Sequence, residues 1–72
     1  MELLEIERSE TLAREEVAKR LHALADALAR HNEIEFDRGG SHFRLKVPDQ
    51  VGVKVELEVG DDGTELEIEL SW

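Results

Sequence analysis

Every second residue is apolar from Val51 to Val59 and again from Leu66 to Trp72. A period of two places successive side chains on opposite sides of an extended strand, so each segment predicts a strand with one apolar face. The loop between the two segments contains Asp62–Gly63, which is typical of a tight hairpin turn. The sequence therefore predicts an antiparallel hairpin that must bury one face against another part of a folded protein.

Placing Asp62 and Gly63 at the turn sets the register of this hairpin. The apolar partners in that register are Val59–Leu66, Leu57–Ile68, Val55–Leu70 and Val53–Trp72. On the other face, Glu58 lies opposite Glu67 and Glu56 lies opposite Glu69. Like charges directly opposite one another are mildly destabilising in dilute buffer.

A second hairpin is predicted upstream, with Gly39–Gly40 as its two-residue loop. That loop places Phe36 opposite Phe43 and Ile34 opposite Leu45 on one face, and Glu35 opposite Arg44 and Glu33 opposite Lys46 on the other. Because apolar partners and opposite charges agree on one register, the two kinds of evidence support each other.

The apolar period changes to that of a helix over residues 12–30. Four apolar residues at spacings of four, three and four form one stripe: Val17, Leu21, Leu24 and Leu28. Acidic residues precede basic ones at spacing four in Glu15–Lys19, Glu16–Arg20 and Asp26–Arg30. Thr11 is the candidate N-cap of this helix, and His31–Asn32 is its expected end.

The opening segment, residues 3–8, alternates as well and predicts a further strand. Its neighbour is left open, because it can lie parallel to residues 33–37 or antiparallel to residues 65–72. The expected order is therefore a strand, a helix and four strands, within a single domain over residues 1–72. The expected fold class is α+β, with two layers and one helix covering the apolar face of a mainly antiparallel five-stranded sheet.

Charge and composition exclude several classes of protein. Eighteen acidic side chains against nine basic ones give a net charge of −9, and the chain has no cysteine. Without cysteine there is no disulfide or thiolate metal site, and the acidic balance argues against a nucleic-acid partner. No apolar run is long enough to span a bilayer and no secretory signal opens the chain, so a cytoplasmic protein without a membrane partner is expected.

Three stretches resemble the amphi-Trp domain family, which is named for its amphipathic strands and terminal tryptophan. They are the helix sequence from Arg14 to Leu28, the tripeptide Val47-Pro48-Asp49, and the ending from Glu65 to Trp72. One departure is Ala13, at a position where the family often has a serine cap. The resemblance implies a small acidic protein of a kind common in halophilic archaea, with no assigned reaction or catalytic residue.

No constellation of residues predicts an enzyme. The hydroxyl side chains all lie at expected turns or ends, and carboxylates on an exposed sheet lack the asymmetric environments that acid/base catalysis needs. The histidines His22, His31 and His42 lack the i, i+4 spacing of a helical zinc site. We therefore expect no catalytic residue, no metal ligand and no cofactor.

The leading functional hypothesis is a non-enzymatic protein-interaction module adapted to high salt. An exposed edge strand and Trp72 are its contact candidates, with another protein or a second copy in a homodimer as the partner. The parity of Trp72 favours a different role, as a lid on the core. The alternative function is weak binding of divalent cations or a small ligand on the acidic outer face, by Glu56, Glu58, Glu67 and Glu69. That face is also explained by solvation in concentrated salt, which screens the repulsion.

Overall fold

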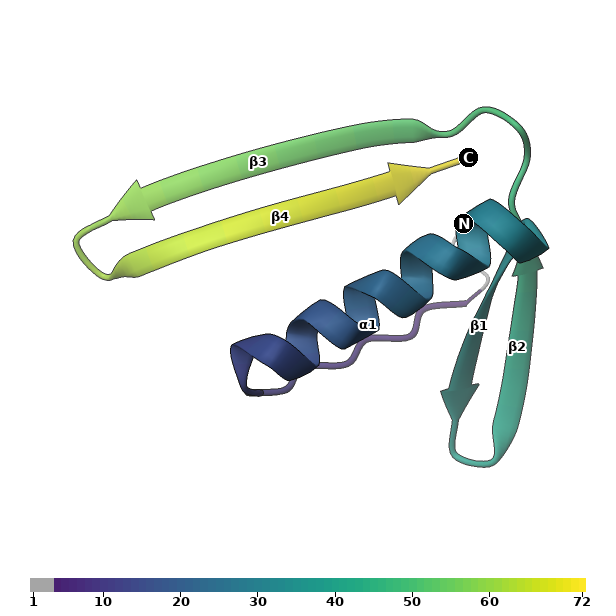
Figure 1. The fold of residues 1–72 in the computed structure, drawn as a ribbon. Helices are drawn as coiled ribbons and strands as arrows, with labels where there is room; N and C mark the ends of the chain where they lie inside the picture. Colours follow the sequence, from purple (N-terminus) through teal and green to yellow (C-terminus); the bar gives the residue numbers. More distant parts are fainter. Residues whose placement is uncertain (1–3) are drawn as a thin grey trace.

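The computed structural model describes residues 4–72, in which one helical segment is followed by two β-hairpins (Figure 1). Helix α1 spans Arg14–Asp26 and continues as a π-helical turn, η1, over Ala27–His31. Strand β1 (Glu33–Arg38) pairs with β2 (Ser41–Lys46), and β3 (Gly52–Gly60) pairs with β4 (Gly63–Ser71), both antiparallel. The α+β class is confirmed, but the four strands form two separate two-stranded sheets, so the prediction of one five-stranded sheet is wrong.

The helix begins two residues later than the sequence predicts. Ala13 occupies the N-cap position with an extended backbone, and its carbonyl oxygen accepts the N–H groups of Glu16 at 3.0 Å and Val17 at 3.1 Å. No side chain caps this end, so the prediction of a Thr11 cap is wrong. The end of the helix is confirmed, because Asn32 takes the left-handed conformation with φ 53°.

Two of the three expected ion pairs along the helix form. The Glu16–Arg20 and Asp26–Arg30 pairs each have a nitrogen–oxygen distance of 3.9 Å. Oε1 of Glu15 instead lies 3.8 Å from Nη2 of the neighbouring Arg14. All of these side chains are substantially exposed, so each pair contributes only a few tenths of a kcal/mol.

The register of the β1–β2 hairpin is confirmed in every predicted pair. Gly39 and Gly40 form the loop with φ values of 53° and 85°, the positive values that a tight two-residue turn of this kind requires. At the far end of the hairpin, the Val47 N–H donates to the Asn32 carbonyl oxygen at 2.8 Å. This bond joins the end of the helical segment to the end of β2.

The predicted register of the β3–β4 hairpin is wrong by two residues. The observed partners are Val59–Thr64, Leu57–Leu66, Val55–Ile68 and Val53–Leu70. Asp61 and Asp62 form the loop, and Gly63, with φ 144°, opens β4. A slip of two residues preserves side-chain parity, so in both registers the apolar side chains gather on one face, although in the observed register Val59 faces Thr64.

The predicted first strand does not form in the described residues 4–8, while Leu3 lies outside the described range. Hydrogen bonds from two guanidinium groups, instead of strand pairing, attach this segment to β1. Arg8 donates through Nη2 to the carbonyl oxygen of Asp37 at 3.1 Å, and Arg38 donates through Nη1 to the carbonyl oxygen of Glu5 at 3.2 Å. The segment then runs beside α1, where Glu10 accepts a hydrogen bond from Arg20 at 2.9 Å (Figure 1).

The chain is open rather than layered. The helical segment packs on β1 through η1, whereas the β3–β4 hairpin makes substantial contacts only between its own two strands (Figure 1). The radius of gyration is 14.3 Å, against about 11 Å for a compact domain of this length. No side chain among residues 4–72 is buried, so the expected core beneath a covering helix is absent from this part of the chain.

Candidate interaction surface

The β3–β4 hairpin carries one continuous apolar face. Residues directly opposite in an antiparallel pair point to the same side, so alternation collects the apolar side chains of both strands there. This hairpin apolar face consists of Val53, Val55, Leu57, Val59, Leu66, Ile68 and Leu70. Leu70 is half-buried, and the exposed fractions of the others run from 54% for Ile68 to 72% for Val59. Single exposed apolar residues are ordinary in proteins, but a contiguous patch of this kind marks a contact surface.

Trp72 follows the end of β4 and continues the alternation of Leu66, Ile68 and Leu70. Its predicted partner, Val53, pairs with Leu70 instead. The residue is 52% exposed, so within one copy it does not close over a core.

The other face of the hairpin is acidic, with a different pairing from the predicted one. Glu56 lies opposite Glu67, and Glu58 lies opposite Glu65. Glu69 lies opposite Lys54, whose Nζ is 3.7 Å from Glu56 Oε2. The predicted pairs Glu58–Glu67 and Glu56–Glu69 are therefore wrong, for the same two-residue slip. Within residues 4–72, no group of three or more histidine or acidic side chains is arranged to hold a metal ion.

A second apolar surface lies on the other half of the molecule. We call it the helix stripe, and it comprises Val17, Leu21 and Leu24 of α1 with Phe36 of β1 and Leu45 of β2. These side chains are between 39% and 52% exposed. The amphipathic pattern of the helix is thus realised in the structure, but the sheet expected to cover it lies elsewhere.

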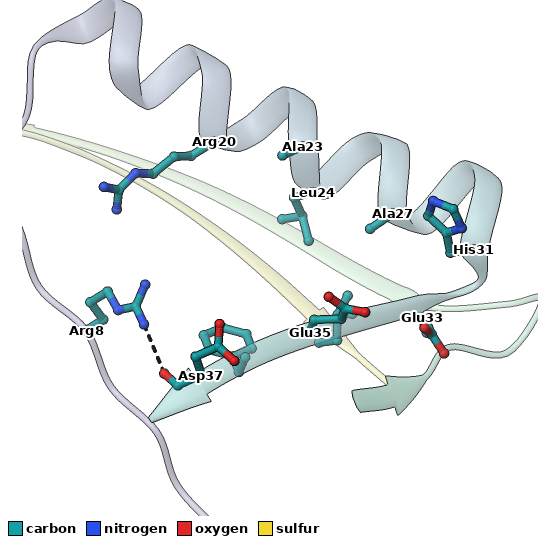
Figure 2. A pocket seen from close by; sticks show the side chains of 11 residues that line it. Arg8, Arg20, Ala23, Leu24, Ala27, His31, Glu33, Glu35 and Asp37 are labelled. Carbon is teal, nitrogen blue, oxygen red and sulfur yellow. Dashed lines mark hydrogen bonds between the residues drawn. The ribbon is translucent and has the colours of Figure 1, made fainter. Parts of the chain in front are cut away.

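A groove of about 670 Å³ runs between the helical segment and β1 (Figure 2). Ala23, Leu24 and Ala27 line it from the helical side, and Arg8 and Arg20 lie at one end. The Arg8 guanidinium is held there by its hydrogen bond to Asp37. The helical segment contacts β1 mainly through η1, and the groove is the open space along the rest of this helix–strand interface. We interpret it as an uncovered packing surface.

Charged side chains elsewhere are explained by local structure. On the β1–β2 hairpin, Arg44 Nε lies 3.3 Å from Glu35 Oε1, and His42 contacts Asp37. The hydrogen bond from Arg20, aided by its charge and by Arg8, lowers the pKa of the Glu10 carboxyl. The same contact raises the pKa of Arg20. The first two contacts join the strands of one hairpin, and the Glu10–Arg20 contact attaches the opening segment to α1.

No helix within the described residues has the length and hydrophobicity needed to cross a bilayer. Comparison with known families gives one result, a match of the Amphi-Trp domain over residues 1–72. Neither the comparison with curated proteins nor the comparison with solved structures gave a match. The family match spans the full length of the sequence.

Proposed function

The chain belongs to the Amphi-Trp domain family, and we propose that it acts as a non-enzymatic protein-interaction module whose binding element is the β3–β4 hairpin. The observation that carries this proposal is the hairpin apolar face, most of which is more than half exposed. Leaving such a face in water is unfavourable by roughly 25 cal/mol per Å² of apolar surface. Covering this face with a protein partner therefore stabilises the complex by a corresponding amount.

The two faces of the hairpin suit different surroundings. The apolar face supplies contact area, and Trp72 beside it supplies a side chain of the kind that dominates binding energy in many interfaces. The acidic face keeps the hairpin solvated, and concentrated salt screens its opposed carboxylates. Adaptation to high salt is part of the proposal for this reason.

Site-specific photo-crosslinking in cells tests the proposal. A photoreactive phenylalanine analogue at Leu57 lies in the middle of the apolar face, and the same analogue at Glu58 lies on the acidic face of the same strand. We expect protein adducts from position 57 and far fewer from position 58. Equal adducts from both positions, or none from either, would contradict the proposal.

A second candidate function is weak binding of divalent cations on the acidic face. The pairs Glu56–Glu67 and Glu58–Glu65 support it, because each places two acidic residues directly opposite one another across the hairpin. An NMR titration with calcium or magnesium, against sodium at matched ionic strength, tests it. Shifts confined to these residues and specific to the divalent ion are expected, and identical shifts in sodium would remove the idea.

A further inference from the structure

The exposed surface of one copy is too large for a stable monomer of this size. The chain exposes 6896 Å², whereas a compact monomer of 8.2 kDa exposes about 4,500 Å². The excess is about 2,400 Å². A standard protein–protein interface covers about 800 Å² on each partner, and obligate dimers cover more. One copy therefore carries enough uncovered surface for an obligate interface.

The uncovered surface comes in two parts that match each other. The nine residues of β3 extend over about 30 Å. The helical segment of Arg14–His31 extends over about 27 Å. Apolar side chains run along the whole of β3 in the hairpin apolar face, and from Val17 to Leu24 of the helical segment in the helix stripe. A sheet face packed on a helix is one of the standard two-layer arrangements.

Within one copy the two parts do not meet. The Val47–Asn32 hydrogen bond fixes the end of β2 against the end of the helical segment. Pro48 follows at once, and a proline fixes its own φ at about −65° and favours an extended conformation for the residue before it. The hairpin is thereby carried away from the helix stripe, so both apolar surfaces are left without cover in the same molecule.

From this we propose that the partner of the hairpin is a second copy of this chain. In the resulting two-fold dimer, each β3–β4 hairpin lays its apolar face on the helix stripe of the other copy. The inference rests on the proposed function, because it names the partner of the same surface. A second copy is favoured over another protein, since reciprocal exchange covers all four apolar surfaces of two copies at once and closes the assembly.

Charge gives this dimer a distinct response to salt. Each copy has a net charge of −9, so two copies repel one another in dilute buffer. Screening removes the repulsion while the apolar contact remains, so dimerisation tightens as potassium chloride rises. Binding of a basic partner to the acidic face has the opposite dependence.

The first test is the mass of the full chain by light scattering after gel filtration, over a concentration series in low and in molar potassium chloride. We expect twice the mass of 8.2 kDa, with tighter association in salt. Leu57→Glu places a charge in the apolar contact and should weaken dimerisation about 10- to 100-fold. Glu58→Gln, on the opposite face, is the matched control and should leave it intact. A monomer at every concentration would overturn the proposal.

The absence of cysteine from the chain allows a second test that reports the arrangement directly. Leu21→Cys and Leu57→Cys copies, mixed under oxidising conditions, should form a disulfide between copies, and Leu21→Cys mixed with Glu58→Cys should not. When both Leu21→Cys and Leu57→Cys are in one chain, a disulfide within a dilute monomer would show that the hairpin folds back on its own helix, which overturns the proposal.

The outcomes separate this inference from the proposed function. A monomer whose position-57 photo-crosslinker captures a different protein overturns the dimer and keeps the interaction module. A monomer with an intrachain disulfide and no captured protein overturns both.

Discussion

Glu56 of β3 lies directly opposite Glu67 of β4, so two carboxylates share one solvent-facing position across the hairpin. The next pair on that face, Glu58 and Glu65, repeats the arrangement. Opposed like charges destabilise a strand pair, by about 0.2–1 kcal/mol for each pair. We expect the urea midpoint of unfolding to rise between low and molar potassium chloride, because salt screens these repulsions. A midpoint that stays level or falls would contradict this prediction.

Glu67→Lys and Glu69→Lys form a matched pair of variants for the observed register. Both change the net charge by the same amount, but Glu67 lies opposite Glu56, whereas Glu69 lies opposite Lys54. We expect Glu67→Lys to stabilise the hairpin by about 0.2–1 kcal/mol and Glu69→Lys to destabilise it by a similar amount. Urea unfolding in low salt measures the difference. Equal effects of the two variants would show that net charge, rather than cross-strand pairing, controls stability.

Gly63 and Gly60 flank the same turn but differ in backbone conformation. Gly63 has φ 144°, which a residue with a side chain adopts only with strain, whereas Gly60 has no positive φ. At neither position does an added Cβ have an atom within 4 Å, so steric overlap does not distinguish the two substitutions. We expect Gly63→Ala to cost about 1–3 kcal/mol and Gly60→Ala to cost clearly less. Thermal unfolding of the two variants compares them, and equal losses would contradict the turn described above.

The local elements could be predicted from sequence wherever two independent signals agreed. The β1–β2 register followed from Gly39–Gly40, from Phe36 opposite Phe43 and from Glu35 opposite Arg44. For β3–β4 the alternation gathers the apolar side chains on one face in either register, and Asp62–Gly63 pointed to the wrong one. Lys54 lies opposite Glu69 only in the observed register, so matching of opposite charges was the signal that distinguished the two registers.

The relation between the elements could not be predicted in the same way. Alternation identifies which face of a strand is apolar, but it does not say which surface covers that face. The sequence predicted an apolar stripe along the helix and an apolar face on the hairpin, and it predicted that the helix covers the apolar face of one sheet containing that hairpin. Their separation depends on Asn32, Val47 and Pro48, where the chain changes direction. Residues 4–8 alternate like a strand, but they are attached to β1 by side-chain hydrogen bonds of Arg8 and Arg38 instead of by strand pairing.

Ala13 leaves the start of α1 without a side-chain cap. A serine at this position has Glu16 three residues later, which completes the capping box in which each side chain bonds the other residue's backbone N–H. We expect Ala13→Ser to stabilise the fold by about 0.5–2 kcal/mol in urea unfolding. Thr11→Ala is the control, because Thr11 does not cap the helix, and it should change stability little. A larger loss from Thr11→Ala than gain from Ala13→Ser would overturn this account of the helix start.

The Glu10–Arg20 contact makes the attachment of the opening segment depend on pH. The hydrogen bond from Arg20 lowers the pKa of Glu10 below its ordinary value of 4.5. A carboxyl with a lowered pKa in the folded state stabilises that state above its ordinary pKa, and this contribution is lost as pH falls through the lowered value. An NMR titration of the Glu10 carboxyl should therefore give a midpoint below 4.5. Arg20→Gln should move the midpoint back up, whereas Arg30→Gln, which removes the same charge beside Asp26, should leave it unchanged. A midpoint that both variants move equally would mean that overall charge, and not the hydrogen bond, sets the titration of Glu10.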